Sequence, residues 1–335
     1  MSKLNRITAN ITGIGKYLPE KKLTNKDLEK YLETSDEWIQ DRTGIKVRHI
    51  ASENQATSDL CINAINQLLD NRKISSKEID VIIVATVTPD MMFPSTACII
   101  QEKIGAKNAW GFDLSGACSG FLFALQTGAQ FIETGRYKKV LVIGADTMSS
   151  ILNYSDRNTC ILFGDGAGAA LLEPSKNQYG ILDSKLRIDG TGAEYLYLKA
   201  GGSRMPTTID TINKDYHYLY QEGKTVFKHA VNGMYNVSKD ILDRNNLSIN
   251  QIDLFIPHQA NKRIIDLTAK RLKIPNEKVL INIEKYGNTT AGTIPIAMNE
   301  AITENRINDG DYILLSSFGA GFTWGSMLIK WEMRS

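Results

Sequence analysis

The sequence Asp113-Leu-Ser-Gly-Ala-Cys118-Ser-Gly-Phe121 is a corner of small residues between two apolar runs. The run before it, residues 109–114, has the length of a buried strand. The run after it, residues 121–132, has the length of a helix and is apolar on nearly every face at its start. Cys118 is therefore predicted at the N-terminus of a buried helix, where unpaired N–H groups and the helix dipole favour a thiolate. Cysteine is also a common packing residue, so a nucleophile needs partners elsewhere in the chain.

Length and composition describe an ordinary globular chain. Its 335 residues exceed the roughly 150 of a typical domain, so two domains or one large double unit are expected. The net charge of +2 does not suggest a nucleic-acid binder. No apolar run is long enough to span a bilayer and the N-terminal segment has no signal-peptide core, so we expect a cytoplasmic protein without membrane contact. The four cysteines are widely spaced, which favours neither disulfides nor a metal site.

The second half of the sequence repeats the order of the first. Three pairs of segments are similar at offsets of 173, 172 and 172 residues: 76–83 with 250–256, 140–143 with 312–315, and 118–120 with 290–292. A shared spacing indicates a duplicated unit of about half the chain. Each copy alternates helices with strands that are apolar throughout, which predicts sheets covered on both faces.

The predicted fold class is therefore α/β, with two similar halves packed together. We place the halves at residues 1–174, which carry the cysteine, and 175–335. The repeat sets the helix that starts at Cys118 opposite the helix that starts near Thr290, so we expect their N-termini to meet at one central site. The stretch 191–224 is rich in Gly, Thr, Asp and Tyr without periodicity, and we expect this long loop over a site or at an interface.

Two polar residues are candidate partners for the cysteine. His258 directly follows an apolar strand pattern and Pro257, so its side chain is predicted at the carboxyl edge of a sheet, where α/β proteins bind ligands. The alternative is a loop-end histidine held by local hydrogen bonds. Asn288 lies at a predicted helix start, where asparagine is also a common turn or N-cap residue. The other histidines, His49, His217 and His229, are predicted to be structural or solvated.

Several motifs together resemble the β-ketoacyl-acyl carrier protein synthase III family. The resemblance covers essentially the whole chain and rests on these segments: 38–44, 113–121, 156–157, 163–168, 257–261, 287–291 and 318–325. It implies a thiolase-like fold with a five-layered α-β-α-β-α core, and a homodimer. It also implies an initiating condensing enzyme of type II fatty acid synthesis, which condenses an acyl-coenzyme A primer with malonyl-acyl carrier protein.

The resemblance assigns roles residue by residue. Its catalytic residues match Cys118, His258 and Asn288. Its coenzyme A site matches Trp38, Arg42 and Arg157. Its acyl and pantetheine pocket matches Phe93, offered across the dimer, and Phe227, Ala260 and Phe318. Its carrier-protein surface matches Lys228, Gln259, Arg263 and Lys270. The resemblance implies no metal and no tightly bound cofactor, with the coenzyme A thioester as substrate.

One departure from the family pattern is Ala320, where glycine is frequent. The role carried over to this position is a backbone N–H that meets the oxyanion, so we expect function to survive the change.

Relatives with other activities differ at single residues. An elongating synthase pairs its cysteine with two histidines, but no histidine follows His258. A degradative thiolase carries a second reactive cysteine near its C-terminus, but no cysteine follows Cys160. An acyltransferase of secondary metabolism that acts on another acceptor keeps similar residues and stays open as the alternative. A non-catalytic binding subunit is expected to have lost the cysteine. The sequence leaves the acyl chain preference open.

Overall fold

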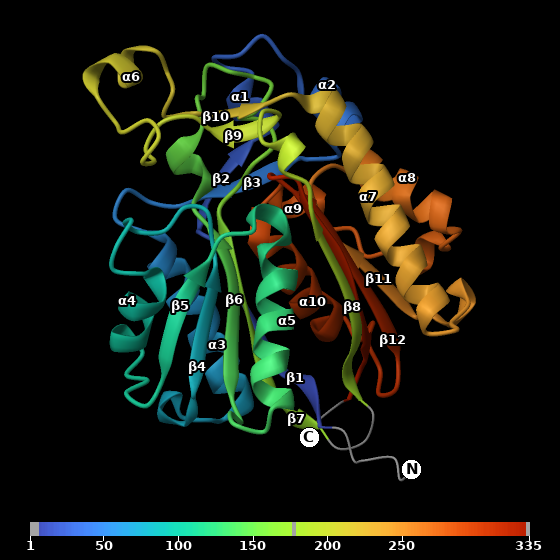
Figure 1. Ribbon diagram of the computed structural model, residues 1–335. Coiled ribbons are helices and arrows are strands. Elements are labelled where there is room, and N and C mark those ends of the chain that lie inside the picture. Colours follow the sequence, from blue (N-terminus) through green and yellow to red (C-terminus); the bar gives the residue numbers. More distant parts are fainter. Residues whose placement is uncertain (1–6, 176–178, 333–335) are drawn as a thin grey trace.

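The segment around Cys118 lies at the centre of five stacked layers of helices and sheets (Figure 1). The computed structural model describes residues 7–175 and 179–332. Across Figure 1, an outer helix pair is followed by a sheet, a central helix pair, a second sheet and a second outer helix pair. The five-layered α/β fold expected from the sequence is therefore confirmed. The N-terminal segment that was searched for a signal core lies largely outside the described residues.

The first sheet has five strands in the order β1-β7-β6-β4-β5. Strand β4 is parallel to both of its neighbours, whereas β7 is antiparallel to β1 and β6. The bounds are β1 (Thr8–Tyr17), β4 (Val81–Ala85), β5 (Trp110–Leu114), β6 (Val140–Asp146) and β7 (Gly166–Ser175), with α3 (Thr57–Arg72) and α4 (Thr96–Lys103) on the outer face.

The second sheet repeats this plan with four strands in the order β11-β12-β13-β8. Strands β11 and β12 are parallel, and β13 is antiparallel to both neighbours. The bounds are β8 (Gly180–Ile188), β11 (Leu254–Pro257), β12 (Tyr312–Gly319) and β13 (Thr323–Lys330), with α7 (Gly223–Arg244) and α8 (Lys262–Leu272) outside. An isolated parallel bridge between Phe255 and Val279 takes the position that β5 has in the first sheet.

The centre is formed by α5 (Gly120–Glu133) and α10 (Thr293–Thr303), which pack between the two sheets. Each begins with a 3-10 turn, η2 (Ala117–Ser119) and η7 (Thr290–Gly292) respectively, and the two turns are in contact. Ala117 and Thr290 both have left-handed backbones, with φ of 47° and 46°. The true repeat offset here is therefore 173 residues, and the predicted pairing of Cys118 with Thr290 was wrong by one residue.

The core explains why the first turns of α5 are apolar. Phe121, Leu122 and Leu125 are fully buried in one cluster that joins both sheets and α10. Full burial of such side chains contributes about 1.5–3 kcal/mol each. The prediction of a buried helix after Cys118 is confirmed, as is the meeting of the two helix N-termini. The boundary between the halves after residue 174 stays a prediction; β7 ends at Ser175.

Strand β5 differs from the sequence-based expectation of a buried strand. It is the edge strand of its sheet, and its residues are half-buried or exposed, with Trp110 at 45% exposure. The apolar sequence predicted burial, but the sheet ends at this strand within one chain. Its aromatic side chains therefore face solvent in the single chain.

The remaining elements gather at one end of the sheets, above the central helices in Figure 1. They are β2 (Lys21–Thr24), α1 (Asn25–Leu28), α2 (Asp36–Thr43), β3 (Val47–Ile50), β9 (Leu196–Leu198), α6 (Ile209–Asn213), β10 (Leu219–Gln221) and α9 (Ile283–Tyr286). The long stretch 191–224 thus contains a small sheet and a helix that its composition did not predict. Within the described residues, no helix combines the length and the apolar character needed to cross a membrane.

Candidate active site

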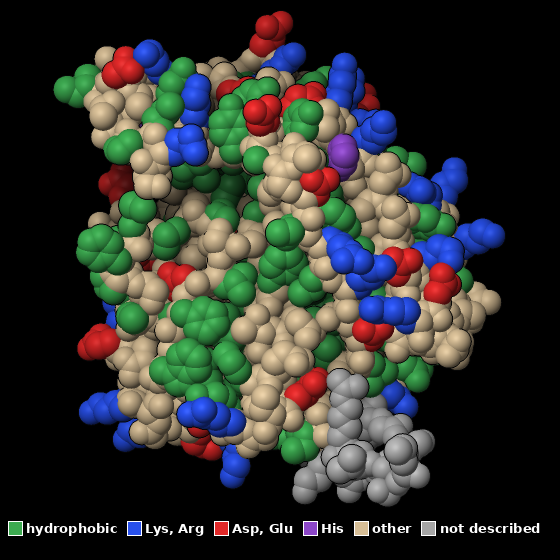
Figure 2. All heavy atoms as spheres, viewed as in Figure 1, with side chains coloured by type: hydrophobic (Ala, Val, Ile, Leu, Met, Phe, Trp, Pro, Cys, Tyr) green, Lys and Arg blue, Asp and Glu red, His purple; other side chains and the backbone are tan. Residues whose placement is uncertain are grey.

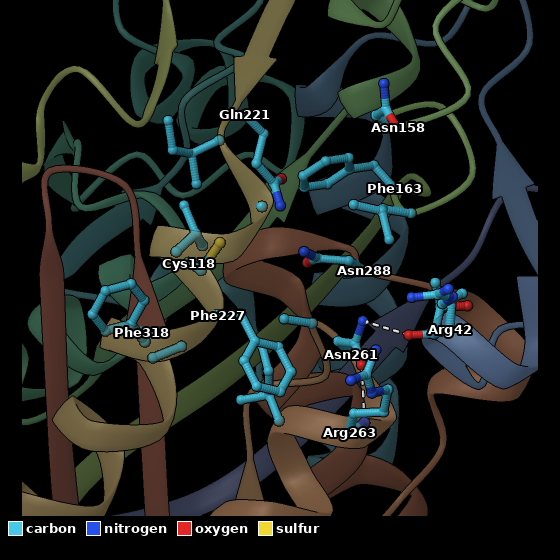
Figure 3. A pocket seen from close by; sticks show the side chains of 18 of the residues that line it. Arg42, Cys118, Asn158, Phe163, Gln221, Phe227, Asn261, Arg263, Asn288 and Phe318 are labelled. Atoms are coloured by element: carbon cyan, nitrogen blue, oxygen red, sulfur yellow. Dashed lines mark hydrogen bonds between the residues drawn. The ribbon is translucent and has the colours of Figure 1, made fainter.

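A cavity of about 610 Å³ brings Cys118, His258 and Asn288 together. Figure 3 shows Cys118 and Asn288 in this cavity. The three residues come from the start of α5, the end of β11 and the segment before η7, so both halves contribute to it. Each is at least nine-tenths buried. The sequence-based expectation that these residues share one site is therefore met by the fold.

The corner that carries Cys118 is held by the β12-β13 hairpin of the other half. Ser317 Oγ donates to the Cys118 carbonyl at 2.8 Å, and Thr323 Oγ1 donates to the Gly116 carbonyl at 3.0 Å. Ser119 Oγ in turn donates to the Thr323 carbonyl at 3.1 Å. These bonds satisfy carbonyls at a tight turn and fix the sulfur relative to the second half.

Gly319, at the end of β12, packs closely against the backbone of Cys118. A Cβ at this position would stand 2.7 Å from the Cys118 nitrogen and 3.0 Å from its Cβ. Only a residue without a side chain fits there. Gly319 also lines the cavity, and Ala320 follows it in the turn between β12 and β13. The oxyanion role expected for the Ala320 N–H stays a prediction.

The protonation state of Cys118 differs from the expectation. Burial, with a smaller contribution from the nearby Asp146 carboxylate, raises the pKa of the Cys118 thiol to about 12, against a lowering by the residue's own backbone N–H. The cost of desolvating a thiolate exceeds the help from the helix start. The free chain therefore holds a neutral thiol at pH 7, and the predicted thiolate was wrong for this state.

Asp146 is a buried carboxylate that the sequence did not single out. It ends β6 and accepts hydrogen bonds from the hydroxyls of Thr86 and Thr88 and from the Val87 N–H at 2.8–3.0 Å. Its second oxygen accepts from the Thr290 hydroxyl of the other half. The available signal was an aspartate closing an otherwise apolar strand. It ties the η7 turn to the end of β4.

His258 projects from the carboxyl end of β11, as predicted. Its backbone N–H donates to the Ser316 carbonyl at 2.8 Å, and its ring Nδ1 lies 2.6 Å from Thr293 Oγ1. Burial lowers the pKa of His258 to about 3, so the ring is neutral at pH 7. Its Nε2 has no hydrogen-bond partner among the described residues. The second ring nitrogen is thus a buried polar atom without a partner among the described residues, on a residue that lines the cavity.

Asn288 combines the two roles considered for it. Its Oδ1 accepts a hydrogen bond from the Thr290 N–H at 2.9 Å, which is the local bond expected of an asparagine in a turn. This bond directs the amide nitrogen into the cavity, and Figure 3 shows the side chain extending toward Cys118. Its backbone is clamped by Leu162 and Gly164 at 2.9 and 3.0 Å. The amide can therefore donate to a bound group beside the sulfur.

The mouth of the cavity contains Trp38 and Arg42, both on α2. The Arg157 guanidinium lies 5.1 Å from the Trp38 ring centre and that of Arg42 lies 5.8 Å away. Arg157 also donates to the Glu33 carbonyl. The three residues are neighbours, as the resemblance implied. Because Arg157 contacts the indole directly, a planar ring enters between them only if the guanidinium moves.

Of the four expected pocket residues, Phe227, Ala260 and Phe318 line the cavity. Phe93 is 83% exposed and lies outside the cavity of its own chain. The cavity also has walls that were not predicted individually, among them Leu196, Gln221, Lys224 and Asn261. Three of these belong to the stretch 191–224, which confirms that this segment covers the site.

The expected carrier-protein residues divide into two groups. Lys228 on α7 and Arg263 and Lys270 on α8 are exposed, on adjacent helices. Gln259 is only 1% exposed, and its amide bonds the Pro257 and Leu280 carbonyls and the Asn282 N–H. A side chain used in this way cannot contact a protein at the surface, so its assignment there was wrong.

Other sequence candidates are peripheral. Cys61 and Cys160 are buried, whereas Cys98 is exposed. In residues 7–175 and 179–332, no group of three or more His, Cys, Asp or Glu side chains is arranged to hold a metal ion.

Comparison with known proteins decides the family. Two family models match, the 3-oxoacyl-[acyl-carrier-protein] synthase III model at residues 112–190 and its C-terminal model at residues 242–331. The β-ketoacyl-[acyl-carrier-protein] synthase III of Koribacter versatilis is 54% identical over 96% of this chain and 98% of that protein. The chain belongs to the β-ketoacyl-[acyl-carrier-protein] synthase III family. The sequence-based prediction of an initiating condensing enzyme of fatty acid synthesis, a transferase, is therefore confirmed.

Solved synthase III structures have the same fold. The enzyme from Aquifex aeolicus superposes with a TM-score of 0.89 at 43% identity, over 96% of this chain and 100% of that one. The enzyme from Thermus thermophilus gives 0.91 at 42% identity, over 97% and 100%. A priming β-ketosynthase from the R1128 polyketide pathway also superposes, at 0.89 over 98% and 97%, but with 31% identity. These relatives favour the fatty acid synthases over the secondary-metabolism alternative and confirm the thiolase-like fold.

Proposed function

We propose that Cys118, His258 and Asn288 are the catalytic residues of a two-stage condensation between an acyl-coenzyme A and a malonyl-acyl carrier protein. The observation that carries the proposal is one cavity in which a thiol, a neutral imidazole and a carboxamide converge behind a mouth containing an indole and an arginine. Nucleophilic catalysis by cysteine needs access for a thioester, and stabilisation of charge needs donors fixed in advance.

In the first stage the Cys118 sulfur attacks the carbonyl carbon of the acyl-coenzyme A. The bond from that carbon to the coenzyme A sulfur breaks, and the thiol proton ends on the departing sulfur. Because the free thiol has a pKa of about 12, the proton leaves as the sulfur attacks rather than beforehand. The N–H groups of Cys118 and Ala320 face the developing oxyanion in this proposal, which the contact of Gly319 with the Cys118 backbone supports.

In the second stage the malonyl thioester loses carbon dioxide, and negative charge develops on its thioester oxygen. His258 and Asn288 donate hydrogen bonds to that oxygen. The resulting carbanion attacks the acyl carbon on Cys118, a carbon–carbon bond forms, and the bond to sulfur breaks. The released thiolate takes a proton from water, and the β-ketoacyl-acyl carrier protein leaves.

The exposed residues Lys228, Arg263 and Lys270 carry the proposed docking surface for the carrier protein. Arg263 is the key member, because it is exposed on α8 and also lines the cavity mouth. Exposed charges of this kind act on association more than on chemistry and are screened by salt. We therefore expect Arg263→Glu with Lys270→Glu to raise the KM for malonyl-acyl carrier protein several-fold at low salt. An unchanged KM would move the docking surface elsewhere.

A homodimer through β5 accounts for the exposed apolar edge of the first sheet. Trp110 packs with Phe112, Phe131 and Tyr137 at ring separations of 5.6–6.0 Å. Figure 2 presents hydrophobic side chains gathered over this region. An uncovered edge strand with exposed aromatic side chains favours pairing with another chain, and Phe93 would then reach the partner's cavity. Trp110→Lys is expected to produce a monomer in sedimentation velocity; a dimer of unchanged stability would contradict this arrangement.

The direct test of the proposed function follows both stages separately. Intact-protein mass spectrometry after incubation with acetyl-coenzyme A is expected to show one acetyl group on Cys118. Addition of malonyl-acyl carrier protein is then expected to discharge the acetyl group and release carbon dioxide. If no adduct forms on Cys118 with acetyl-, butyryl- or isobutyryl-coenzyme A, the assignment of the nucleophile fails. The same set of thioesters determines the acyl preference.

A further inference from the structure

The two ring nitrogens of His258 lie in different surroundings. Nδ1 is 2.6 Å from the hydroxyl oxygen of Thr293, the first residue of α10, and Nε2 has no hydrogen-bond partner among the described residues. His258 is 2% exposed and lines the cavity. A neutral imidazole carries a proton on only one of these nitrogens. The position of that proton decides whether the ring offers the cavity a donor or a lone pair.

The Thr293 hydroxyl has one proton and two acceptors within reach. One is His258 Nδ1 at 2.6 Å, and the other is the Thr290 carbonyl at 3.1 Å, one turn back along the chain. Hydrogen bonds donated by a hydroxyl are shorter than those donated by a nitrogen, which centre on about 2.9–3.0 Å. The shorter contact therefore fits a hydroxyl that donates to Nδ1 better than a ring N–H that donates to oxygen.

We propose that Thr293 is a positioning residue, which donates its hydroxyl proton to His258 Nδ1 and thereby keeps the single ring proton on Nε2, facing the cavity. The inference rests on the proposed function and deepens it by assigning a tautomer to the imidazole. In the opposite tautomer, Nε2 would turn a lone pair toward the oxygen on which negative charge develops. The surroundings of the ring are consistent with a neutral form, because burial lowers the pKa of His258 to about 3.

The same turn orients the second donor. The Thr290 N–H holds Asn288 Oδ1 at 2.9 Å, which points the amide nitrogen into the cavity, and Thr293 orients the imidazole. The Thr290 hydroxyl is itself bonded to the buried Asp146 carboxylate. One short segment of the second half therefore sets the direction of both N–H groups, and Asp146 anchors this segment to the first half.

Three variants separate the effect of the Thr293 hydroxyl from the effect of the branched shape of the side chain. Thr293→Val keeps the branched shape and removes the donor, and Thr293→Ser keeps the donor. Thr303→Val is the matched control, because Thr303 lies on the same helix and its hydroxyl donates to the Asn299 carbonyl, away from the cavity. Loss of a group that orients a functional side chain commonly costs about 10- to 100-fold in activity. We expect that loss in the condensation step of Thr293→Val, with Thr293→Ser and Thr303→Val close to wild type.

A spectroscopic measurement reads the tautomer directly. In protein labelled with ¹⁵N-histidine, the chemical shifts distinguish a protonated from an unprotonated ring nitrogen, and the spectrum of His258→Gln assigns the His258 signals among the four histidines. We expect an unprotonated Nδ1 and a protonated Nε2 in the wild type and in Thr293→Ser. Thr293→Val is expected to show a mixture of tautomers.

The outcomes are separable. A wild-type protein that forms acyl-Cys118 and condenses, but carries its proton on Nδ1, overturns the inference and leaves the proposed function intact. A Thr293→Val protein with wild-type spectra and rates also overturns it. If Thr293→Val does not fold, the wild-type and Thr293→Ser spectra still decide the tautomer. Failure of the wild type to condense would remove the proposed function, whereas the spectra would still test the contact.

Discussion

The two turns at the centre of the molecule, 116–120 and 288–292, use the same backbone for opposite purposes. Each has one left-handed residue, Ala117 or Thr290, which is the first residue of a 3-10 turn that leads into a buried helix. The first turn is built from small side chains and leaves its cysteine open to the cavity. The second holds an amide and a hydroxyl in hydrogen bonds within the protein, from the Thr290 N–H to Asn288 Oδ1 and from the Thr290 hydroxyl to the Asp146 carboxylate.

The difference lies in how rigidly each turn holds its functional group. Cys118 is held by its backbone only, through bonds from the β12-β13 hairpin, so the sulfur is free to exchange acyl groups. Asn288 and His258 are held by their side chains, through Thr290 and Thr293. Donors that stabilise a transition state act best when they are oriented beforehand, whereas a nucleophile must move toward its substrate. A duplicated backbone thus supplies the reacting group from one half and the fixed donors from the other.

The largest effect is expected from breaking the first turn. Cys118→Ser replaces the sulfur by a poorer nucleophile, and loss of a nucleophile costs an enzyme on the order of 10⁴- to 10⁶-fold. We expect no acyl adduct by mass spectrometry and no condensation. Cys98→Ser, at an exposed cysteine outside the cavity, is the control and should behave as wild type. Acylation of Cys118→Ser at the normal rate would place the nucleophile elsewhere.

Breaking the second turn is expected to affect only the later stage. His258→Ala or Asn288→Ala removes one donor to the developing charge, which typically costs about 10²- to 10³-fold. Release of ¹⁴CO₂ from malonyl-acyl carrier protein should fall by this factor, and the acetyl adduct on Cys118 should still form. Asn299→Ala removes an amide on α10 that bonds the Ile14 carbonyl, away from the site, and serves as the control. Equal loss in both stages would mean that the two turns do not divide the chemistry.

A larger side chain at Gly319, in the second half, tests the contact between this residue and the turn that carries Cys118. Gly319→Ala places a Cβ about 2.7 Å from the Cys118 nitrogen, and backbone atoms cannot move aside cheaply. We expect acylation to slow by at least about tenfold, because a small displacement of a reacting group is costly. Gly190→Ala adds the same methyl group where nothing lies within 4 Å and should leave acylation unchanged. A fully active Gly319→Ala protein would show that the contact is loose.

The pH dependence of Cys118 alkylation tests whether the first turn holds a thiol or a thiolate. Burial raises the pKa of its thiol to about 12, so the thiolate fraction should rise about tenfold with each pH unit below that value. Alkylation of the free enzyme by iodoacetamide, followed by peptide mass spectrometry at the Cys118 peptide, should increase in the same way from pH 7 to pH 10. The exposed Cys98 provides an internal reference in the same sample. A plateau for Cys118 below pH 9 would indicate a thiolate stabilised by the helix start.

Much of the fold could be predicted from local patterns. The apolar run after Cys118 predicted the buried helix α5, and the similar offsets predicted two halves with helix starts that meet. The one-residue error in the pairing of the turns arose because apolar strands and small residues align at more than one offset. The left-handed residues Ala117 and Thr290 settle the register, and neither alanine nor threonine signals that conformation in a sequence.

Site residues were predicted correctly where the residue type itself indicates the chemistry. They were missed or misplaced where the role of a residue depends on its neighbours in the folded protein. Cys118, His258 and Asn288 share the cavity as expected. Gln259, which follows His258 and precedes a polar loop, was assigned to the carrier-protein surface. Its amide group instead makes three hydrogen bonds inside the protein. Asp146 and Thr293 were not identified, because their significance comes from partners more than 30 residues away.

By itself, the sequence determined the alternation of helices and strands in two similar halves, the buried helix after Cys118 and the identity of the three chemical groups, because periodicity and motif spacing are local properties of the chain. Only the tertiary structure decided that the thiol is protonated, that β5 is an open edge and that the imidazole contacts Thr293. The physical reason is that desolvation and hydrogen-bond geometry depend on atoms brought together from distant parts of the chain, and no local pattern encodes those distances.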